Sequence, residues 1–567
     1  MATGDVCVRL VSGRADALSG RYFLATRTFD EIVGRPAAIL KDDLMPLCYG
    51  RSGRYTPAHG WTSRPGSQGH RASLGCIAAG EKDIDGFPTP GPRLLAMVLA
   101  MIIMSLLSDV EAASDAKDKE GAAMPIALHP DNPHYFLFRG KPAVLITSGE
   151  HYGAVLNSAF DYAAYLDEVK ACGLNLTRTF SGVYMESPAS FGIAKNTLAP
   201  AEGKLLCPWA RSRVAGYAAG GNKFDLTRFD PAYFRRLKDF VSNASDRGIV
   251  VELVLFCPFY KEEMWDLSPM NARNNVNGIG QIARTDALTL KNGALLDIQL
   301  ALVRRIIEEL KDADNVYYEI CNEPYFGGVT MDWQHHIAET IVEAEKGFPA
   351  RHLIAQNIAN GTAQIRDPHP AVSIFNFHYA TPPDAVAQNF GLNKPIADDE
   401  TGFKGTADAH YRREGWEFIL AGGAVYSNID YSFTVEHPRG TFQFPPKQPG
   451  GGGPALRTQL GILKRFIEGF DFIRMRPFGE AVQGGVPAGA SVRVLADPGR
   501  AYAVCLHGGK QATLALELPA ATYEVEWIDT LTGAVDKSLR LEHAGGRAEV
   551  ISPPYEEDIA LRIVKLP

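Results

Sequence analysis

Two glutamates of this 567-residue chain stand where buried strands would end. Glu323 follows the apolar, aromatic run 316–320, and Glu400 ends the run 395–400. Two carboxylates on either side of a sugar can divide the work of breaking its acetal bond. One protonates the departing oxygen, and the other attacks the anomeric carbon when the carboxyl groups are about 5–5.5 Å apart. The sequence predicts this chemistry for Glu323 and Glu400, provided that the fold brings them to one cavity.

The fold that would position them alternates buried strands with amphipathic helices. The predicted strands cover residues 143–147, 174–180, 249–256, 316–320, 352–357, 373–380, 395–400 and 424–433. The predicted helices cover residues 159–173, 230–248, 295–313, 332–347, 409–423 and 454–470. Eight such strands in roughly 330 residues predict an α/β fold, a (β/α)8 TIM barrel over residues 125–470. An open doubly wound sheet is the alternative, but its glycine-rich first turn is missing from the sequence.

The chain after the barrel changes character. Short alternating or apolar runs separated by Gly, Pro and Asp predict a C-terminal antiparallel β-sandwich domain over residues 472–567. We expect this domain to pack on the barrel rather than to bind sugar. Trp527 and Tyr523 are its main candidates for an exposed aromatic platform.

The N-terminal part has no sustained periodicity. Residues 1–92 are rich in Gly, Pro, Arg and Ser, which predicts a disordered extension or an over-long gene start. Residues 93–112 have a positive flank at Arg93, an apolar core over 94–107 and small residues after it, as in a signal peptide. We therefore expect a secreted or periplasmic protein with no membrane association after cleavage. A membrane anchor with a cytoplasmic tail is the alternative.

Composition narrows the classes of partner. The net charge is −8 and no dense Lys/Arg block occurs, so nucleic acid is not an expected partner. Eight cysteines without a CxxC pair exclude zinc-ribbon and thioredoxin-like sites. His335 and His336 have no carboxylate at metal-ligand spacing, so we expect no metal and no cofactor. A carbohydrate is the expected partner, and we expect a monomer.

The active residues of a barrel lie at the C-terminal ends of its strands. Besides the two glutamates, the predicted strand ends carry Glu150, His151, Arg178, His378, Tyr379, Asn428 and Asp430. Of these, Glu150 and His151 are candidates for contact with the substrate. The long segment 181–229 follows the second strand, and such loops usually belong to the site. An acid also needs a raised pKa, and the aromatic residues around Glu323 predict an apolar setting that would provide it. These are Tyr317, Tyr318, Tyr325 and Phe326.

The motif EICNEP at residues 319–324, followed by DETGF at 399–403, resembles clan A glycoside hydrolases, especially the cellulase-like family 5. The resemblance covers about residues 125–470. It implies that Asn322 contacts a sugar 2-hydroxyl, that Glu323 is the acid/base and that Glu400 is the nucleophile. It also matches Arg178 to the arginine of strand two, whose positive charge would keep the nucleophile ionised.

Two positions depart from the pattern of this family. In its strand-six motif the His and Tyr are often one residue apart, whereas His378 and Tyr379 are adjacent, so either one can face the nucleophile. Strand eight of the family often presents a tryptophan platform. This sequence has none there, and Tyr426 or Tyr431 would substitute.

The sequence thus predicts a secreted, retaining β-glycoside hydrolase that acts on a β-linked poly- or oligosaccharide by a two-glutamate double displacement. A non-catalytic glycan-binding protein on a glycosidase-like barrel is the first alternative, although both carboxylates are present. An aldolase or a metal-dependent hydrolase is the second. It would need a strand-end lysine or a His/Asp cluster, and the sequence has neither.

Overall fold

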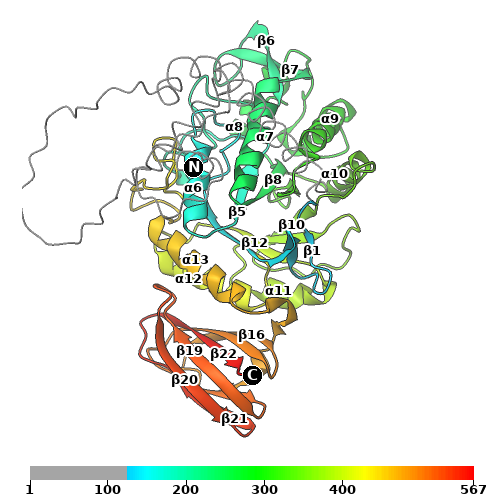
Figure 1. Ribbon diagram of the computed structural model, residues 1–567. Coiled ribbons are helices and arrows are strands. Elements are labelled where there is room, and N and C mark those ends of the chain that lie inside the picture. Colours follow the sequence, from blue (N-terminus) through cyan, green and yellow to red (C-terminus); the bar gives the residue numbers. More distant parts are fainter. Residues whose placement is uncertain (1–123) are drawn as a thin grey trace, which may run out of the picture. The chain divides into compact units, whose positions relative to one another are not determined.

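The computed structural model describes residues 124–567 (Figure 1). The predicted extension over 1–92 and the signal-peptide-like segment 93–112 lie outside the described residues. Within the described part, no helix combines the length and the apolar character that crossing a bilayer requires.

Eight parallel strands form the central sheet, and they pair in the order β4-β13-β12-β11-β10-β9-β8-β5. Their bounds are β4 (Leu145–Gly149), β5 (Leu176–Phe180), β8 (Val250–Phe256), β9 (Val316–Cys321), β10 (Ile354–Asn360), β11 (Ile374–His378), β12 (Ile396–Thr401) and β13 (Val425–Ile429). Asn175 joins the two ends of the sheet. Its side chain accepts a hydrogen bond from Ile146 N (2.9 Å) and donates one to Val144 O (2.8 Å). The predicted TIM barrel is confirmed.

Helices surround these strands (Figure 1). They are α6 (Tyr162–Ala171), α7 (Pro231–Asp246), α8 (Glu262–Leu267), α9 (Gly293–Leu310), α10 (Met331–Ala344), α11 (Asp384–Asn389), α12 (Asp408–Leu420) and α13 (Pro454–Glu468). α7 illustrates how the sequence sets a helix start. Asp230 accepts a hydrogen bond from Ala232 N, and Pro231 takes the first helical position, where no donor is needed. The sequence did not predict α8 and α11, because six residues are too few to show a helical period.

Two small sheets lie outside the barrel sheet, one before β4 and one between β5 and β8. β1 (Ala127–Leu128), β2 (Phe136–Phe138) and β3 (Lys141–Ala143) form a three-stranded antiparallel sheet before β4. Ala143 therefore belongs to this sheet, although the sequence predicted it as the start of the first barrel strand. The long segment after β5 contains the hairpin β6 (Trp209–Ala215) and β7 (Asn222–Phe229).

The C-terminal residues form two antiparallel sheets. The larger pairs β14 (Arg476–Pro477), β16 (Ser491–Asp497), β17 (Ala501–His507), β22 (Asp558–Lys565), β19 (Ala521–Ile528) and β20 (Val535–His543) in that order. The smaller pairs β15 (Val482–Gly484), β18 (Thr513–Leu518) and β21 (Gly546–Ile551). Residues of both sheets share one hydrophobic core. The predicted β-sandwich is confirmed.

The two aromatic residues predicted as candidates for an exposed platform of this domain are buried. Trp527 and Tyr523 are both 0% exposed, because they lie on β19 and face the sandwich core. Arg412 of α12 binds Asp558 of β22 at 2.7 Å, and both side chains are buried. The buried aromatic residues and this buried ion pair agree with a domain that packs on the barrel.

Candidate active site

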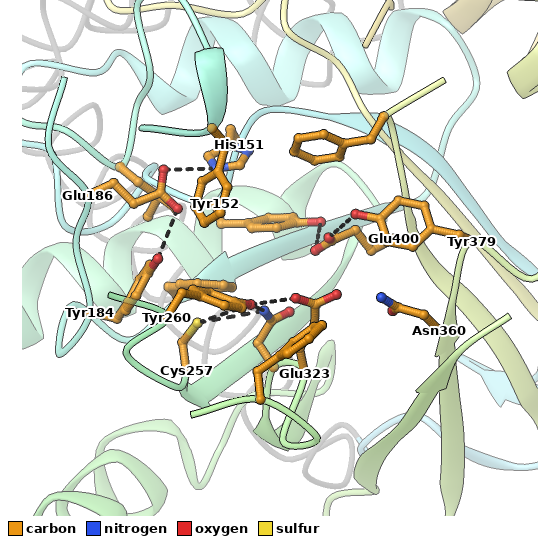
Figure 2. Close-up of a pocket in the computed structure, with 16 residues that line it drawn as sticks. His151, Tyr152, Tyr184, Glu186, Cys257, Tyr260, Glu323, Asn360, Tyr379 and Glu400 are labelled. Carbon is orange, nitrogen blue, oxygen red and sulfur yellow. Dashed lines mark hydrogen bonds and ion pairs between the residues drawn. The ribbon is translucent and has the colours of Figure 1, made fainter. Parts of the chain in front are cut away.

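A cavity of ≈ 300 Å³ opens among the carboxyl ends of the barrel strands and the loops that follow them (Figure 2). Its lining consists of His151, Tyr152, Phe180, Tyr184, Glu186, Phe191, Leu198, Cys257, Tyr260, Asn322, Glu323, Phe326, Asn360, Tyr379, Glu400 and Phe403. Five of the eight residues that the sequence predicted for catalysis or substrate contact line this cavity. They are His151, Asn322, Glu323, Tyr379 and Glu400.

The structure brings the two predicted carboxylates together. Glu323 follows β9, and Glu400 lies near the end of β12. One oxygen of Glu323, one oxygen of Glu400 and a ring nitrogen of His378 all lie within 4.8 Å of one another. The two glutamates are 8% and 6% exposed, so a small part of each remains open to the cavity.

Glu400 is held by three donors. Tyr379 Oη donates to its Oε1 at 2.7 Å, and Tyr152 Oη donates to its Oε2 at 3.0 Å. Arg178 Nη1 donates to the same Oε2 at 3.1 Å. Charge-assisted hydrogen bonds of this kind fix the orientation of a carboxylate.

Glu323 has its own set of donors. Tyr260 Oη donates to Oε2 at 2.6 Å, and Tyr325 Oη donates to Oε1 at 3.3 Å. His378 Nδ1 lies 3.2 Å from Oε1. Burial alone would raise the pKa of Glu323, but the hydrogen bond and charge of His378, with the two tyrosines, lower it below its ordinary value.

The prediction that aromatic residues raise the pKa of Glu323 is therefore wrong for the free protein. Tyr325 supplies a hydrogen-bond donor instead of an apolar wall. Tyr317 and Tyr318 are 0% exposed within β9, where they belong to the core. The expectation failed because the donors that surround Glu323 come from other strands and from loops.

His378 lies between the two glutamates and is fully buried. Its Nδ1 is 3.2 Å from Glu323 and 3.5 Å from Glu400, and its Nε2 is 3.5 Å from Asp399. Burial alone would lower the pKa of His378, but the charges of Glu400, Asp399 and Glu323 raise it to about 9. At neutral pH, the imidazole thus carries a proton between two carboxylates.

Backbone geometry explains how the adjacent His378 and Tyr379 both reach Glu400. Neighbours on a strand point to opposite faces. β11 ends at His378, however, and Tyr379 takes a left-handed conformation with φ 53°. Glu323 (φ 35°) and Tyr152 (φ 59°) are left-handed as well. Such strain costs roughly 1–3 kcal/mol per residue and is common at functional sites.

A sealed group of charges lies beneath the carboxylates, which we call the anchor cluster: Arg178, Glu252, Glu319 and Asp399. All four side chains are at most 1% exposed. Arg178 lies 2.6 Å from Glu319, 3.2 Å from Asp399 and 3.9 Å from Glu252. Burial and the charge of Glu319 raise the pKa of Glu252 to about 8, and burial raises the pKa of Asp399 as well. Arg178 also donates to Asn322 Oδ1 at 2.7 Å and so connects the cluster to the cavity.

The remaining predicted residues take several places. Asn322 donates to Tyr260 Oη at 2.8 Å. His151 lines the cavity, and Tyr431 lies behind it, with ring centroids 6.0 Å apart. Arg178 and His378 contact the carboxylates from below, at 2% and 0% exposure.

Three other strand-end residues serve the scaffold. Glu150 accepts hydrogen bonds from Gly153 N and Ala154 N and thereby shapes the loop after β4. Asp430 forms an ion pair with Arg457 at 2.5 Å. Asn428 donates to Ser148. Tyr426, an alternative for the missing platform, faces α12 instead and donates to Tyr411 O, because it points to the helix side of β13.

The sequence did not predict several residues of the site. Glu252 and Glu319 could have been predicted as members of a buried ion-pair network. Each is a lone acid in an otherwise apolar strand, and a buried charge needs a partner. Tyr152, Tyr260 and Glu186 could not have been predicted, since their place depends on the loops after β4, β8 and β5.

Two groups of described residues have the donor atoms of a cation site. They are Glu323, His378 and Glu400, and Glu252, Glu319 and Asp399. Protein donors bind all carboxylate oxygens of the first group and one oxygen of each acid in the second. A cation at the first would displace the imidazolium proton, and one at the second would lie against Arg178. The donor set therefore fits a hydrogen-bonded network better than a metal ion.

No protein-family model matches this sequence, and no curated protein matches it. Solved structures do match. A proposed glycoside hydrolase from Bacteroides vulgatus has a TM-score of 0.56 at 17% identity, over 79% of this chain and 83% of that one. A family 5 glycoside hydrolase from the same organism has a TM-score of 0.53 at 14% identity, over 78% and 96%. A third structure, described as a glycoside hydrolase, has a TM-score of 0.52 at 14% identity, over 78% and 97%.

The fold is similar to that of family 5 glycoside hydrolases. At such low sequence identities, the similarity to these structures establishes the fold alone, and one fold supports many functions. The function has to be argued from the site.

Proposed function

We propose that this protein is a retaining β-glycoside hydrolase, with Glu323 as the acid/base and Glu400 as the nucleophile. One observation carries the proposal: oxygens of both carboxylates lie within 4.8 Å of each other at one cavity. Retaining enzymes need carboxyl groups about 5–5.5 Å apart, whereas inverting enzymes need roughly 6.5–9.5 Å to admit a water. The similarity of the fold to glycoside hydrolases supports the same class.

In the first step, Glu323 donates a proton to the glycosidic oxygen while Glu400 attacks the anomeric carbon. The bond between that carbon and the glycosidic oxygen breaks, and the sugar becomes an ester of Glu400. Arg178, Tyr152 and Tyr379 hold the Glu400 carboxylate in place by hydrogen bonds. Asn322, which lines the cavity, contacts the 2-hydroxyl of the sugar in this proposal.

The proton for this step is held by His378 in the free protein. His378 Nδ1 lies 3.2 Å from Glu323 Oε1, which is close enough for direct transfer. A bound substrate excludes water and removes solvation from the ion pair, which favours the neutral forms of both groups. Substrate binding thus moves the proton from the imidazolium to Glu323.

In the second step, Glu323 accepts a proton from a water molecule, and the water oxygen attacks the anomeric carbon. The ester bond to Glu400 breaks, and the sugar leaves with its original configuration. Glu323 is protonated again, and its proton returns to His378 when the product leaves.

We also propose a β-linked poly- or oligosaccharide as the substrate, action outside the cytoplasm and a monomeric state. These parts rest on the sequence motifs, on the signal-peptide-like segment and on the absence of any partner signal in the sequence. A glycan-binding protein without catalysis is the second candidate. The presence of both carboxylates, each with donors of its own, favours the enzyme.

A hydrolysis screen tests this proposal. The panel contains β-glucans, mannans, xylans and 4-nitrophenyl β-glycosides, and the variants are Glu323→Gln and Glu400→Gln. We expect hydrolysis of at least one member and a loss of about 10²–10⁴-fold or more in both variants. Glu343→Gln on α10 is the control, because its side chain is 73% exposed. Glycan binding without hydrolysis by the parent protein would favour the second candidate.

A further inference from the structure

The cavity contains a third carboxylate, Glu186, which the two-glutamate mechanism does not use. Figure 2 shows Glu186 at one side of the cavity and Asn360 at the other, with Glu323 and Glu400 between them. Glu186 is 5% exposed and lines the cavity. Tyr184 Oη donates to its Oε1 at 3.1 Å, and Asn196 Nδ2 donates to its Oε2. The carboxylate is thus fixed in place by two donors, as a binding group would be.

His151 stands beside Glu186. Its Nε2 lies 3.6 Å from Glu186 Oε2, too far for a good hydrogen bond. Within residues 124–567, neither ring nitrogen of His151 has a hydrogen-bond partner, although the residue is only 7% exposed. The ring is stacked on Tyr152, so its orientation is set. A buried polar group without a partner at a cavity wall points to a ligand that satisfies it.

The segment that carries Glu186 forms this side of the cavity; its Phe191 lines the cavity and is 37% exposed, but the segment is fixed to three other parts of the barrel. Thr197 Oγ1 donates to Glu150 Oε2 at 2.6 Å, which ties the segment to the end of β4. Ala194 N donates to Gln448 Oε1 at 3.2 Å, and Lys195 pairs with Glu436 at 3.1 Å. Gln448 and Glu436 both follow β13. The wall therefore runs from the loop after β5, past the end of β4, to the loop after β13.

The opposite side of the cavity, next to Glu323, is open. Tyr325 and Phe326 follow Glu323 directly and are 37% and 44% exposed. Asn360 at the end of β10 is also exposed. The leaving group is joined through the oxygen that Glu323 protonates, so the rest of a substrate chain has room on this side. The sugar whose anomeric carbon meets Glu400 then extends toward the side formed by the segment that carries Glu186.

We propose that Glu186 and His151 bind the hydroxyl groups of the terminal, non-reducing sugar, so that the protein releases neutral sugars from chain ends. This inference rests on the proposed glycosidase function. A fixed carboxylate accepts hydrogen bonds from sugar hydroxyls, and the histidine nitrogens supply the complementary partners. A uronic acid at the chain end would place a second negative charge against Glu186 and would be rejected. The cavity of ≈ 300 Å³ is at the small end of ligand sites, which fits a chain end rather than a long chain.

The test uses two readouts on the full chain. The first is the product pattern from β-1,4-linked gluco-, manno- and xylohexaose labelled at the reducing end. The second is kcat/KM on 4-nitrophenyl β-glycosides and on the matching β-glucuronide. The variants are Glu186→Gln and Tyr184→Phe, which removes one donor to Glu186 and keeps its ring. Glu202→Gln, an exposed glutamate of the same segment, is the matched control.

We expect stepwise loss of one terminal unit and labelled products that shorten in sequence. Glu186→Gln should lower kcat/KM on neutral glycosides by about 10- to 100-fold. It should also raise the ratio of glucuronide to glucoside hydrolysis, whereas Glu202→Gln should match the parent protein.

Internal cleavage of the hexaoses, with Glu186→Gln equal to the parent protein, would overturn this inference. The proposed function would still stand in that case, because Glu400→Gln would be inactive. If the parent protein and Glu400→Gln both hydrolyse nothing, the proposed function fails and this inference fails with it.

Discussion

Two clusters of acidic residues lie one above the other in the barrel, and they differ mainly in access. Glu323, His378 and Glu400 form the upper one, and Glu252, Glu319 and Asp399 belong to the anchor cluster. In each cluster, three carboxylate oxygen or imidazole nitrogen atoms, one from each residue, lie within 4.8 Å of one another. The upper glutamates are 8% and 6% exposed at a cavity, whereas the lower acids are 0% exposed. Similar residue types therefore serve chemistry in one layer and support in the other.

The electrostatics of the two clusters differ in the same way. In the upper cluster, donors around Glu323 lower its pKa. In the anchor cluster, burial and the charge of Glu319 raise the pKa of Glu252 to about 8. Arg178 belongs to both environments, since it binds Glu319 at 2.6 Å and Glu400 at 3.1 Å. The lower cluster thus holds the arginine that orients the upper carboxylate.

Replacing Arg178 should have the largest effect, because it removes the positive charge that both clusters share. Arg178→Met should lower the free energy of unfolding by about 3–5 kcal/mol, since buried carboxylates lose their partner. It should also reduce activity, because Glu400 loses a donor. Urea unfolding and kcat/KM measure the two effects. Arg273→Met, whose side chain is 57% exposed, should change stability by less than about 1 kcal/mol. An unchanged free energy of unfolding in Arg178→Met would contradict the proposal that the anchor cluster stabilises the barrel.

The position of His378 between two glutamates predicts a change in the pH profile of activity. The pKa of His378 is raised to about 9, and above that value it can no longer supply the proton to Glu323. His378→Asn should lower kcat/KM by roughly 10–100-fold and move the alkaline limb to lower pH. In this variant, Glu323 would have to hold the proton itself. Parallel alkaline limbs in the two proteins would exclude His378 as the proton store.

Stability should fall as pH rises from 5 to 9, because Glu252 of the anchor cluster and His378 of the upper cluster contribute with the same sign. The folded pKa values of Glu252 and His378 are raised, to about 8 and about 9, from ordinary values of 4.5 and 6.5. The native state therefore binds more protons than the unfolded state, and the stabilisation is complete only below the ordinary values. It is lost as pH rises through the folded values, at up to about 1.4 kcal/mol per pH unit for each group.

Chemical unfolding at several pH values between 5 and 9 measures this slope. Glu252→Gln should flatten the part of the slope below pH 8, because it removes the lower of the two groups. It should also be neutral or stabilising at pH 8, where the charged form is costly to bury. An unchanged slope in this variant would show that Glu252 is already ionised at neutral pH.

The barrel and its carboxylates were predictable because they depend on local pattern. Short apolar runs rich in β-branched and aromatic residues, such as 249–256 and 316–320, indicate buried strands, and a glutamate that follows such a run is expected at the strand end. The pKa of Glu323 was not predictable, since Tyr260 comes from the loop after β8 and His378 from β11. Glu186 was not predictable either, because the path of the segment after β5 is set by contacts with Glu150 and Gln448.

The backbone conformations at the site were also beyond the sequence. Glu323, Tyr379 and Tyr152 adopt left-handed φ values that no residue preference indicates for glutamate or tyrosine. They hold because the surrounding hydrogen bonds and packing over-determine them. This is why the adjacent His378 and Tyr379 left two possibilities open in the sequence, and why both reach Glu400 in the structure.

The most direct test of the two-carboxylate mechanism is the anomeric configuration of the first product released. Proton NMR spectroscopy during the first minutes of hydrolysis, on whichever 4-nitrophenyl β-glycoside the screen identifies, separates the α and β forms before they interconvert. The close spacing of Glu323 and Glu400 predicts the β anomer. An initial α anomer would contradict the covalent intermediate on Glu400 and would point to direct attack by water.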